Sequence, residues 1–263
     1  MDAHKIERQA IALHSRLAES FYSGYEWSES STTRPLSWRQ LFAYGRKRLD
    51  TYLFPALDNA GRQVLDVGCG TGHYISELRA RGFQVCGVDG SRDMLNVARR
   101  NNSGANILEA RVQQLPFPDE SFDAAICIEV LRYVPDWTSC IGEIARVLRP
   151  GGLCLITVSP RLSLNGYWLL NWIDSIVSIP TLQHLKQFFT SSRQLRRVIS
   201  AAGFERPIIR GLYFGPSSWV ARIAPNFLPR YLRFCEPMDT RLVSKAWLSD
   251  FSNMCLVSAR KQQ

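Results

Sequence analysis

The chain contains 263 residues, enough for one large domain whose core carries insertions. Hydrophobic residues make up 46% of the sequence and charged residues 21%, which excludes a disordered or collagen-like protein. The formal net charge of +9 is unevenly distributed: residues 1–159 carry 18 basic and 18 acidic side chains, whereas residues 160–263 carry 14 and 5. A uniformly basic protein is therefore excluded.

The first residues, Met1 to Arg8, are charged and lack the apolar stretch of a signal peptide. The strongest apolar run, residues 167–173, is interrupted by Asn171 and falls well short of the roughly 20 residues that span a bilayer. Seven cysteines occur without a Cys-x-x-Cys pair, and several lie in apolar runs where a reduced cysteine acts as a small hydrophobe. We expect a reduced, cytoplasmic protein without a metal site.

Strand and helix signals alternate through the middle of the chain, a pattern typical of βαβ units and a parallel sheet. The helix that begins near Trp137 is expected to end at Pro150, which two glycines follow. Further helices are expected after Gly72, after Ser91 and from Ser191 or Ser192 onward. Apolar runs predict seven strands, at residues 64–67, 84–88, 106–108, 123–128, 153–158, 208–214 and 254–259.

Three segments stand outside this pattern; they are rich in aromatic residues and are interrupted by prolines. Each is too short to form an independent domain, so we expect them to cover the functional edge of the sheet. The predicted single domain, residues 1–263, thus comprises a helical cap at 1–60, a ligand-binding core at 61–159, cap insertions at 160–190 and 214–253, and sheet elements at 191–213 and 254–263.

A glycine-rich turn, Val64 to Gly72 (VLDVGCGTG), joins the first expected strand to a helix. Its alternating glycines let the backbone turn sharply and approach a ligand where a side chain would collide. Asp89 ends the next strand, 21 positions after Gly68, where a carboxylate can accept hydrogen bonds from both ribose hydroxyls of a nucleoside. A dinucleotide fingerprint would place glycine at His73, so the pattern favours a nucleoside ligand without a pyrophosphate.

Four motifs follow one another in order: VLDVGCGTG at 64–72, GVDGS at 87–91, LPFPDESFD at 115–123 and RVLRPGG at 146–152. In this order and spacing they resemble the class I S-adenosylmethionine-dependent methyltransferases of the broad small-molecule branch. The resemblance is close over residues 64–158 and looser over 190–213 and 254–260. It implies S-adenosyl-L-methionine as cofactor and S-adenosyl-L-homocysteine as product. It also implies an α/β fold: a Rossmann-like, seven-stranded, mostly parallel sheet with its last strand antiparallel, flanked by helices.

Carried over position by position, the resemblance implies a set of cofactor-binding residues. Asp66 would anchor the glycine loop and link to the methionine amino group, directly or through water. Asp89 would hold the ribose, Met94 would cover one face of the adenine, and Ile128 and Glu129 would lie beside the reactive sulfonium. The remaining members of the set are Gly68, Cys69, Gly70, Gly90, Ser91, Val112, Gln113 and Tyr25.

Two positions depart from the pattern of the relatives. Arg111 stands where they offer an acidic side chain to the adenine amino group, so Gln113 or backbone carbonyls must substitute, or adenine binding is weaker. Tyr133 stands where they often carry histidine, which removes one familiar candidate for a general base. Neither departure touches the glycine loop or Asp89.

Methyl transfer from a sulfonium is an in-line displacement, so the protein must mainly hold an O, N or C nucleophile collinear with the methyl group. A general base is needed only if that nucleophile is protonated. Two of the four histidines, His4 and His14, are assigned to a surface helix and are not candidates. The candidates for catalytic residues are Glu129, Tyr133, His73 and His184, and a structural role is the alternative at each position.

The cap segments offer the candidates for acceptor binding. Tyr22, Trp168 and Trp172 suit either an apolar acceptor pocket or packing beneath the caps. Residues 219–234 interleave cations with large apolar groups, which suits an anionic membrane surface, an acidic acceptor, or a solvated basic face with its aromatics packed inward. Two prolines within this stretch prevent one continuous amphipathic helix.

We therefore predict methyl transfer from S-adenosyl-L-methionine to a small-molecule acceptor, such as a lipid-like molecule or a biosynthetic intermediate. The first alternative is an RNA methyltransferase, which is disfavoured because Cys127 to Val130 lacks the Asn/Asp-Pro-Pro-Tyr/Phe run of methylases that act on base nitrogens. A second alternative, motivated by Arg111, is a non-catalytic module that binds S-adenosylmethionine.

Overall fold

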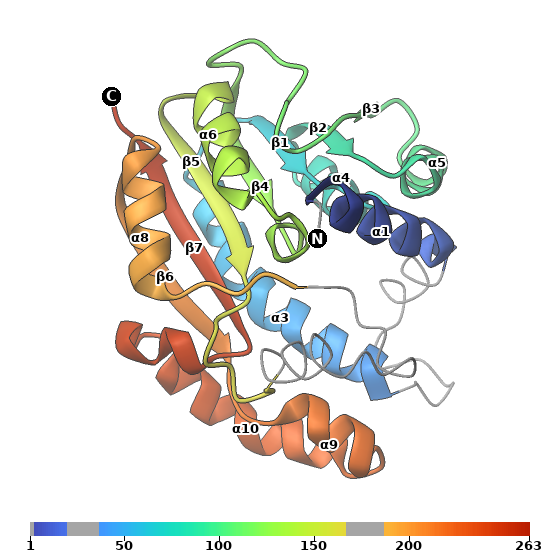
Figure 1. Cartoon of the computed structure of the whole chain (residues 1–263), viewed down its shortest axis with the longest axis vertical. Coiled ribbons are helices and arrows are strands. Elements are labelled where there is room, and N and C mark those ends of the chain that lie inside the picture. The colour runs from blue at the N-terminus through green and yellow to red at the C-terminus, as the bar shows by residue number, and fades with distance from the viewer. Residues whose placement is uncertain (1–2, 20–36, 167–186) are drawn as a thin grey trace.

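The computed structural model describes residues 3–19, 37–166 and 187–263. This part of the chain forms a seven-stranded sheet in the order β3-β2-β1-β4-β5-β7-β6, in which β7 runs antiparallel to both of its neighbours (Figure 1). The predicted mostly parallel sheet with an antiparallel last strand is confirmed. The strands are β1 Gln63–Val67, β2 Gln84–Asp89, β3 Asn106–Glu109, β4 Phe122–Cys127, β5 Leu148–Val158, β6 Phe204–Tyr213 and β7 Met254–Lys261.

Helices cover both faces of this sheet (Figure 1). The described helical elements are α1 Ala3–Arg16, α3 Ser37–Asp58, α4 His73–Ala80, α5 Arg92–Asn101, η1 Leu131–Tyr133, α6 Trp137–Val147, α8 Ser192–Ala201, α9 Ser217–Ile223, α10 Leu228–Leu242 and η3 Ala246–Phe251.

Two apolar clusters form the core, one on each face of the sheet. Successive residues of a strand point to opposite faces, so Leu153 and Leu155 of β5 join one cluster while Cys154 and Ile156 join the other. Side chains of α6 and α8 complete the cluster that holds Cys154, and side chains of α3, α4, α5, α9 and α10 complete the other. The central strands are therefore buried on both faces, which explains their nearly unbroken apolar sequences.

The expected end of the helix at Pro150 was wrong. The helix α6 ends at Val147, and Pro150, Gly151 and Gly152 lie inside β5, which begins at Leu148. Leu148 pairs with Phe122 across an irregularity in the register of β4 and β5, so the chain is already extended before it reaches the proline. The sixth strand likewise begins at Phe204, earlier than the predicted residue 208.

A buried carboxylate ties α10 to α3 and β6. Asp239 of α10 is fully buried and accepts hydrogen bonds from the Tyr44 hydroxyl (2.6 Å) and the Phe214 backbone N–H (3.1 Å). Arg48 of α3, also buried, donates to the Leu212 carbonyl oxygen (3.1 Å) and to Thr240 Oγ1 (2.8 Å). The segment 214–253 is thus packed firmly against α3 and β6.

The structure also bears on the expectations for cysteine and for membrane insertion. All seven cysteines are free thiols. Among the described residues, no helix combines the length and the hydropathy needed to cross a membrane.

We expect Asp239→Ala to lower the free energy of unfolding by roughly 3 kcal/mol or more, because it leaves the Tyr44 hydroxyl and the Phe214 N–H as buried, unsatisfied donors. Glu236→Ala is the matched control on the same helix. It removes only the partly exposed ion pair with Lys47, which contributes about 0–1 kcal/mol. Urea unfolding followed by circular dichroism compares the two, and equal midpoints would contradict the role of Asp239.

Candidate functional site

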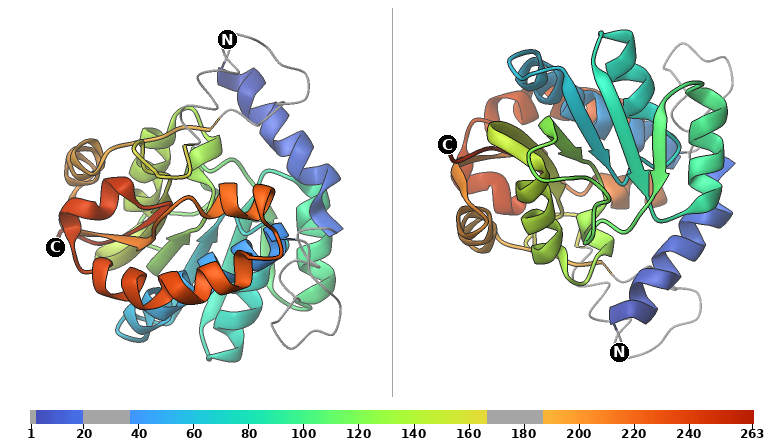
Figure 2. Two further views of the ribbon diagram at one scale, coloured as in Figure 1. Left: turned by 90° about the horizontal axis from the view of Figure 1, so that it is seen from below. Right: turned by 90° about the horizontal axis from the view of Figure 1, so that it is seen from above.

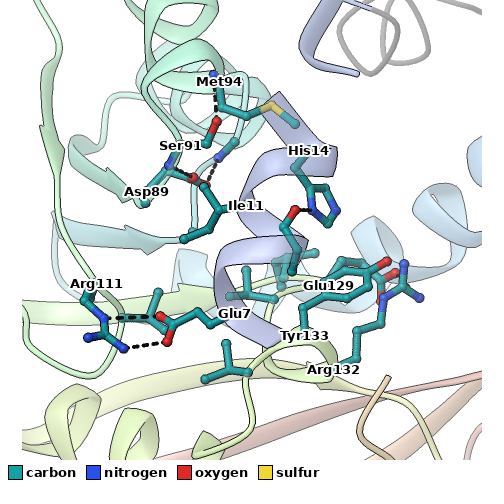
Figure 3. A pocket seen from close by; sticks show the side chains of 18 of the residues that line it. Glu7, Ile11, His14, Asp89, Ser91, Met94, Arg111, Glu129, Arg132 and Tyr133 are labelled. Carbon is teal, nitrogen blue, oxygen red and sulfur yellow. Dashed lines mark hydrogen bonds and ion pairs between the residues drawn. The ribbon is translucent and has the colours of Figure 1, made fainter. Parts of the chain in front are cut away.

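A cavity of about 220 Å³ lies at the carboxyl ends of β1, β2 and β4, beneath α1 (Figure 3). The chain leaves β1 for β2 on one side and returns to β4 on the other, so the loops after these strands diverge and leave a crevice between them. The sequence-predicted residues that line this pocket are Gly68, Gly70, Asp89, Gly90, Ser91, Met94, Val112, Ile128, Glu129 and Tyr133.

The glycine loop takes the backbone shape that its sequence predicts. Gly68 and Gly70 have φ values of 76° and 52°, in the left-handed region that favours glycine. A Cβ atom on Gly68 would lie 2.3 Å from Val130 Cγ2, so the loop passes directly against the segment that follows β4. The N–H groups of Gly68 and Cys69 both donate to the Val88 carbonyl oxygen, at 2.7 and 2.9 Å, and fasten the loop to β2.

Asp89, at the end of β2, organises the floor of the pocket. Its Oδ2 accepts from the Gly70 N–H (2.9 Å), and its Oδ1 accepts from the Ser91 N–H (2.8 Å). Ser91 in turn caps α5, because its Oγ accepts from the Met94 N–H (3.2 Å). Burial raises the pKa of Asp89, while the N–H donors of Ser91 and Gly70 act in the opposite direction and favour the carboxylate.

Asp66 lies below the glycine loop and does not itself line the pocket. It is buried, and its Oδ2 has no hydrogen-bond partner among the described residues. Burial, with a further contribution from Asp89, raises the pKa of Asp66 to about 8. A buried acceptor without a donor is costly, so this oxygen is suited to a donor that the protein chain does not supply.

The loop after β4 places Glu129 in an unusual conformation. Its φ of 62° lies in the left-handed region, which a residue other than glycine adopts at an energetic cost. The Glu129 N–H donates to Thr157 Oγ1 (2.6 Å), and its carboxylate forms an ion pair with Arg132 (2.8 Å). These contacts hold Glu129 at the pocket against the backbone strain.

The N-terminal helix α1 lies within the segment expected to cap the functional edge, and it forms a wall of the pocket (Figure 3). The sequence analysis did not identify which side chains of this helix face the pocket. Glu7 forms an ion pair with Arg111, and Ser15 Oγ lies 2.7 Å from Ser91 Oγ. A Cβ atom on Gly90 would lie only 3.1 Å from Ile11 Cδ1, so the helix rests directly on the turn after β2.

The assignment of His14 to a surface helix was wrong, because His14 lines the pocket and its ring contacts Tyr133 edge to face, with centroids 4.7 Å apart. The pocket residues that the sequence analysis did not propose as binding residues are Glu7, Ala10, Ile11, His14, Phe42, Thr71, Ala110, Arg111, Val130, Arg132 and Val134. The sequence does contain a pattern that could have identified the pocket residues of α1: residues 7, 10, 11 and 14 are spaced so that they lie on one face of a helix.

Several predicted residues do not line the pocket. His73 begins α4, where its ring packs against Tyr74 at 5.0 Å, and burial together with Arg46 lowers its pKa to about 3. Cys69 and Gln113 also lie outside the lining, although the buried Oε1 of Gln113 has no hydrogen-bond partner among the described residues. The predicted residues Tyr22, Tyr25, Trp168, Trp172 and His184 fall outside the described residues.

Comparisons with known proteins agree with the seven-stranded fold and with the glycine loop after β1. Residues 65–156 match the model of a methyltransferase domain. The chain is 35% identical to a ubiquinone biosynthesis O-methyltransferase of Idiomarina loihiensis over 59% of this chain and 67% of that protein. It is 39% identical to a fatty-acid O-methyltransferase of Mycolicibacterium smegmatis over 68% of this chain and 61% of that protein.

Among solved structures, a possible histamine N-methyltransferase from Thermotoga maritima shares the fold, with a TM-score of 0.58 at 20% identity over 86% of this chain and 95% of that one. The chain belongs to the class I S-adenosylmethionine-dependent methyltransferases. It is accordingly an enzyme with S-adenosyl-L-methionine as its cofactor, so the non-catalytic alternative loses its support.

We expect Glu7→Gln to weaken the binding of S-adenosylhomocysteine by up to about fivefold, because the ion pair with Arg111 holds α1 over the pocket. The Arg111 side chain is 49% exposed, which limits the contribution of the pair to about 1 kcal/mol. The charge-swapped double variant, Glu7→Arg with Arg111→Glu, should recover most of the affinity. Lys5→Gln, an exposed change on the same helix, is the control, and calorimetric titration gives the four affinities.

Proposed function

We propose that this enzyme transfers the methyl group of S-adenosyl-L-methionine to an oxygen atom of a small, apolar acceptor. The observation that carries the proposal is the arrangement of Asp89, which lines the pocket while its two oxygens are fixed by the Gly70 and Ser91 N–H groups. A carboxylate oxygen has two lone pairs, so each oxygen retains the capacity to accept a ribose hydroxyl.

The residues present fit this cofactor. Asp89 would hold the ribose, and the left-handed backbone at Gly68 and Gly70 leaves room for the methionine part. The unpartnered Oδ2 of Asp66 would accept from the amino group, directly or through water. Met94 and Ile11, from α5 and α1, lie where they would cover the adenine (Figure 3). When bound, the cofactor supplies an electrophilic methyl group on a sulfonium.

The protein's own contribution is positioning and the exclusion of water. Glu129 and Arg132 fix each other at the wall of the pocket after β4, and α1 closes the opposite side. An acceptor held collinear with the methyl group in such a site reacts as if at high effective concentration. In-line displacement from a sulfonium needs no Lewis acid. We therefore still predict that the reaction uses no metal ion.

The lining favours an apolar acceptor. Phe42, Ile128, Val130 and Val134 all contribute to the pocket and present hydrocarbon surface. The relatives named for ubiquinone biosynthesis and for fatty acids act on oxygen, as their names state. Together these observations support a lipid-like molecule or a biosynthetic intermediate with a reactive oxygen, and they give no support to RNA.

We expect Asp89→Ala to weaken the binding of S-adenosylhomocysteine by about 10- to 100-fold or more, since one or two hydrogen bonds to a charge, each contributing roughly 1.5–3 kcal/mol, are lost. Asp93→Ala, an exposed change in the first turn of α5, is the matched control. Isothermal titration calorimetry measures both variants. No heat from wild-type protein with either S-adenosylmethionine or S-adenosylhomocysteine would overturn the proposed function.

The acceptor class is tested with S-adenosylmethionine labelled in its methyl group, incubated with a long-chain alkylcatechol, with oleic acid and with RNA in separate reactions. We expect label in the ether or ester fraction of an organic extract. Label in RNA, with binding that weakens steeply as salt rises, would support the nucleic-acid alternative instead.

We further propose that α9, α10 and η3 form a surface that contacts anionic membranes. The view from below shows α9 and α10 on the side of the molecule nearest the viewer (Figure 2). Ile223 and Phe234 are each 78% exposed and Trp247 is 74% exposed, so these groups do not pack inward. The other large exposed apolar side chains of this surface are Trp219, Phe227, Met238 and Phe251.

The same elements also carry exposed cations. The exposed basic residues of the segment are Arg222, Arg230, Arg233, Arg241 and Lys245. The acidic residues here are engaged elsewhere: Glu236 pairs with Lys47, Asp239 is buried, and Asp250 accepts from the Ser192 N–H. Exposed apolar groups and exposed cations on the same elements fit the interface of an anionic bilayer, where an apolar acceptor would also reside.

We expect the protein to sediment with vesicles that contain phosphatidylglycerol but not with pure phosphatidylcholine vesicles, and to be released as salt rises. Arg233→Glu should weaken this binding at least fivefold, since each cation near the surface contributes about 1 kcal/mol. Arg92→Glu, which makes the same change of net charge on α5, should bind as the wild type does. Equal loss in both variants would show that only net charge matters and would contradict the proposed surface.

A further inference from the structure

His14 reaches the pocket from α1 in a defined orientation. Its Nδ1 lies 2.7 Å from the carbonyl oxygen of Ala10, one turn earlier in the helix. A carbonyl oxygen can only accept, so Nδ1 is the nitrogen that carries the proton. In the neutral ring the remaining lone pair therefore belongs to Nε2, the nitrogen on the opposite side of the imidazole.

The surroundings of His14 favour the neutral ring. The side chain is partly buried, and burial lowers its pKa below the ordinary value of 6.5. Arg132 of η1 acts in the same direction, whereas the hydrogen bond to Ala10 and the charge of Asp89 act against it. Tyr133, the titratable group in ring contact with His14, fixes the plane of the imidazole edge to face at 4.7 Å. At neutral pH the ring is thus uncharged and basic.

The other candidates in the pocket are less suited to accept a proton near neutral pH. Glu129 is committed to its ion pair with Arg132 at 2.8 Å. Tyr133 is a phenol, whose ordinary pKa of about 10 makes it an acid rather than a base at this pH. Asp89 accepts from backbone N–H groups and, in the proposed function, holds the ribose, so it is not placed to take the acceptor's proton.

We propose that His14 is the general base of the methyl transfer when the acceptor is a hydroxyl. The proposal rests on the proposed function. The acceptor oxygen forms a bond to the methyl carbon, and the methyl–sulfur bond breaks with its electron pair passing to sulfur. The hydroxyl proton moves to Nε2 of His14, which later releases it to water. The products are the methyl ether, S-adenosylhomocysteine and one proton, so atoms and charge balance.

The first test measures the rate of a single turnover with a long-chain alkylcatechol, whose hydroxyl must lose a proton, and with oleic acid, which is already ionised. We expect His14→Gln to slow transfer to the catechol by about 10²- to 10⁴-fold, to leave transfer to oleate within a few-fold, and to preserve the affinity for S-adenosylhomocysteine. Ala12→Gln, on the exposed side of the same helix, is the matched control.

The pH dependence separates a base from a structural residue. In the wild type, the rate with the catechol should fall only at acidic pH, where His14 becomes protonated, because burial lowers the pKa of His14; this acid limb should vanish in His14→Gln. Added imidazole should restore part of the activity of His14→Ala. An ¹⁵N spectrum of the wild type, which needs no acceptor, should show the proton on Nδ1.

The outcomes are distinguishable. A wild-type enzyme that methylates the catechol while His14→Gln does so equally fast overturns the role of His14 and leaves the proposed function intact. An enzyme that accepts only oleate, or a proton found on Nε2, also overturns it. A wild type that transfers label to no acceptor overturns the proposed function itself.

Discussion

The site depends on one carboxylate that performs two structural tasks at once. Asp89 accepts from Gly70 of the glycine loop and from Ser91, the residue that caps α5, so one carboxylate links the two sides of the pocket. Because both oxygens are already oriented by backbone donors, a ribose would meet acceptors that need no rearrangement, and such preorganisation reduces the cost of binding. The parallel strands bring Gly68 and Asp89 together, whereas the sequence separates them by 21 positions.

The helix α1 places a side chain beside each of the two positions that depart from the pattern of the relatives. Arg111 lacks the acidic group expected at its position, and it holds the carboxylate of Glu7 beside the pocket. Tyr133 lacks the imidazole often found there, and its ring contacts the imidazole of His14. Arg111 and Tyr133 thus each contact a side chain of the N-terminal helix, more than 90 residues away in the sequence.

The sequence was sufficient for the sheet and the glycine loop because their signals are local: apolar runs such as residues 153–158, glycines that require positive φ, and an acidic residue at a strand end. The sequence-based predictions were wrong where contacts between distant residues determine the structure. Pro150 reads as a helix stop, yet pairing of Leu148 with Phe122 extends the chain earlier. His14 reads as part of an ordinary amphipathic helix, because nothing in residues 3–16 indicates that Ser91 and Arg111 lie against it. Tertiary contacts across about 100 residues leave no local pattern.

The wall that α1 builds has a consequence for how a catalytic cycle ends. If the spent cofactor leaves on the side of the pocket that α1 covers, the helix must separate from the pocket and the contact between Ser15 and Ser91 must break. The same displacement would bring His14 into bulk water, where an imidazolium formed during the reaction loses its proton at once. Release of the product and deprotonation of His14 would then both depend on the same step, the opening of α1.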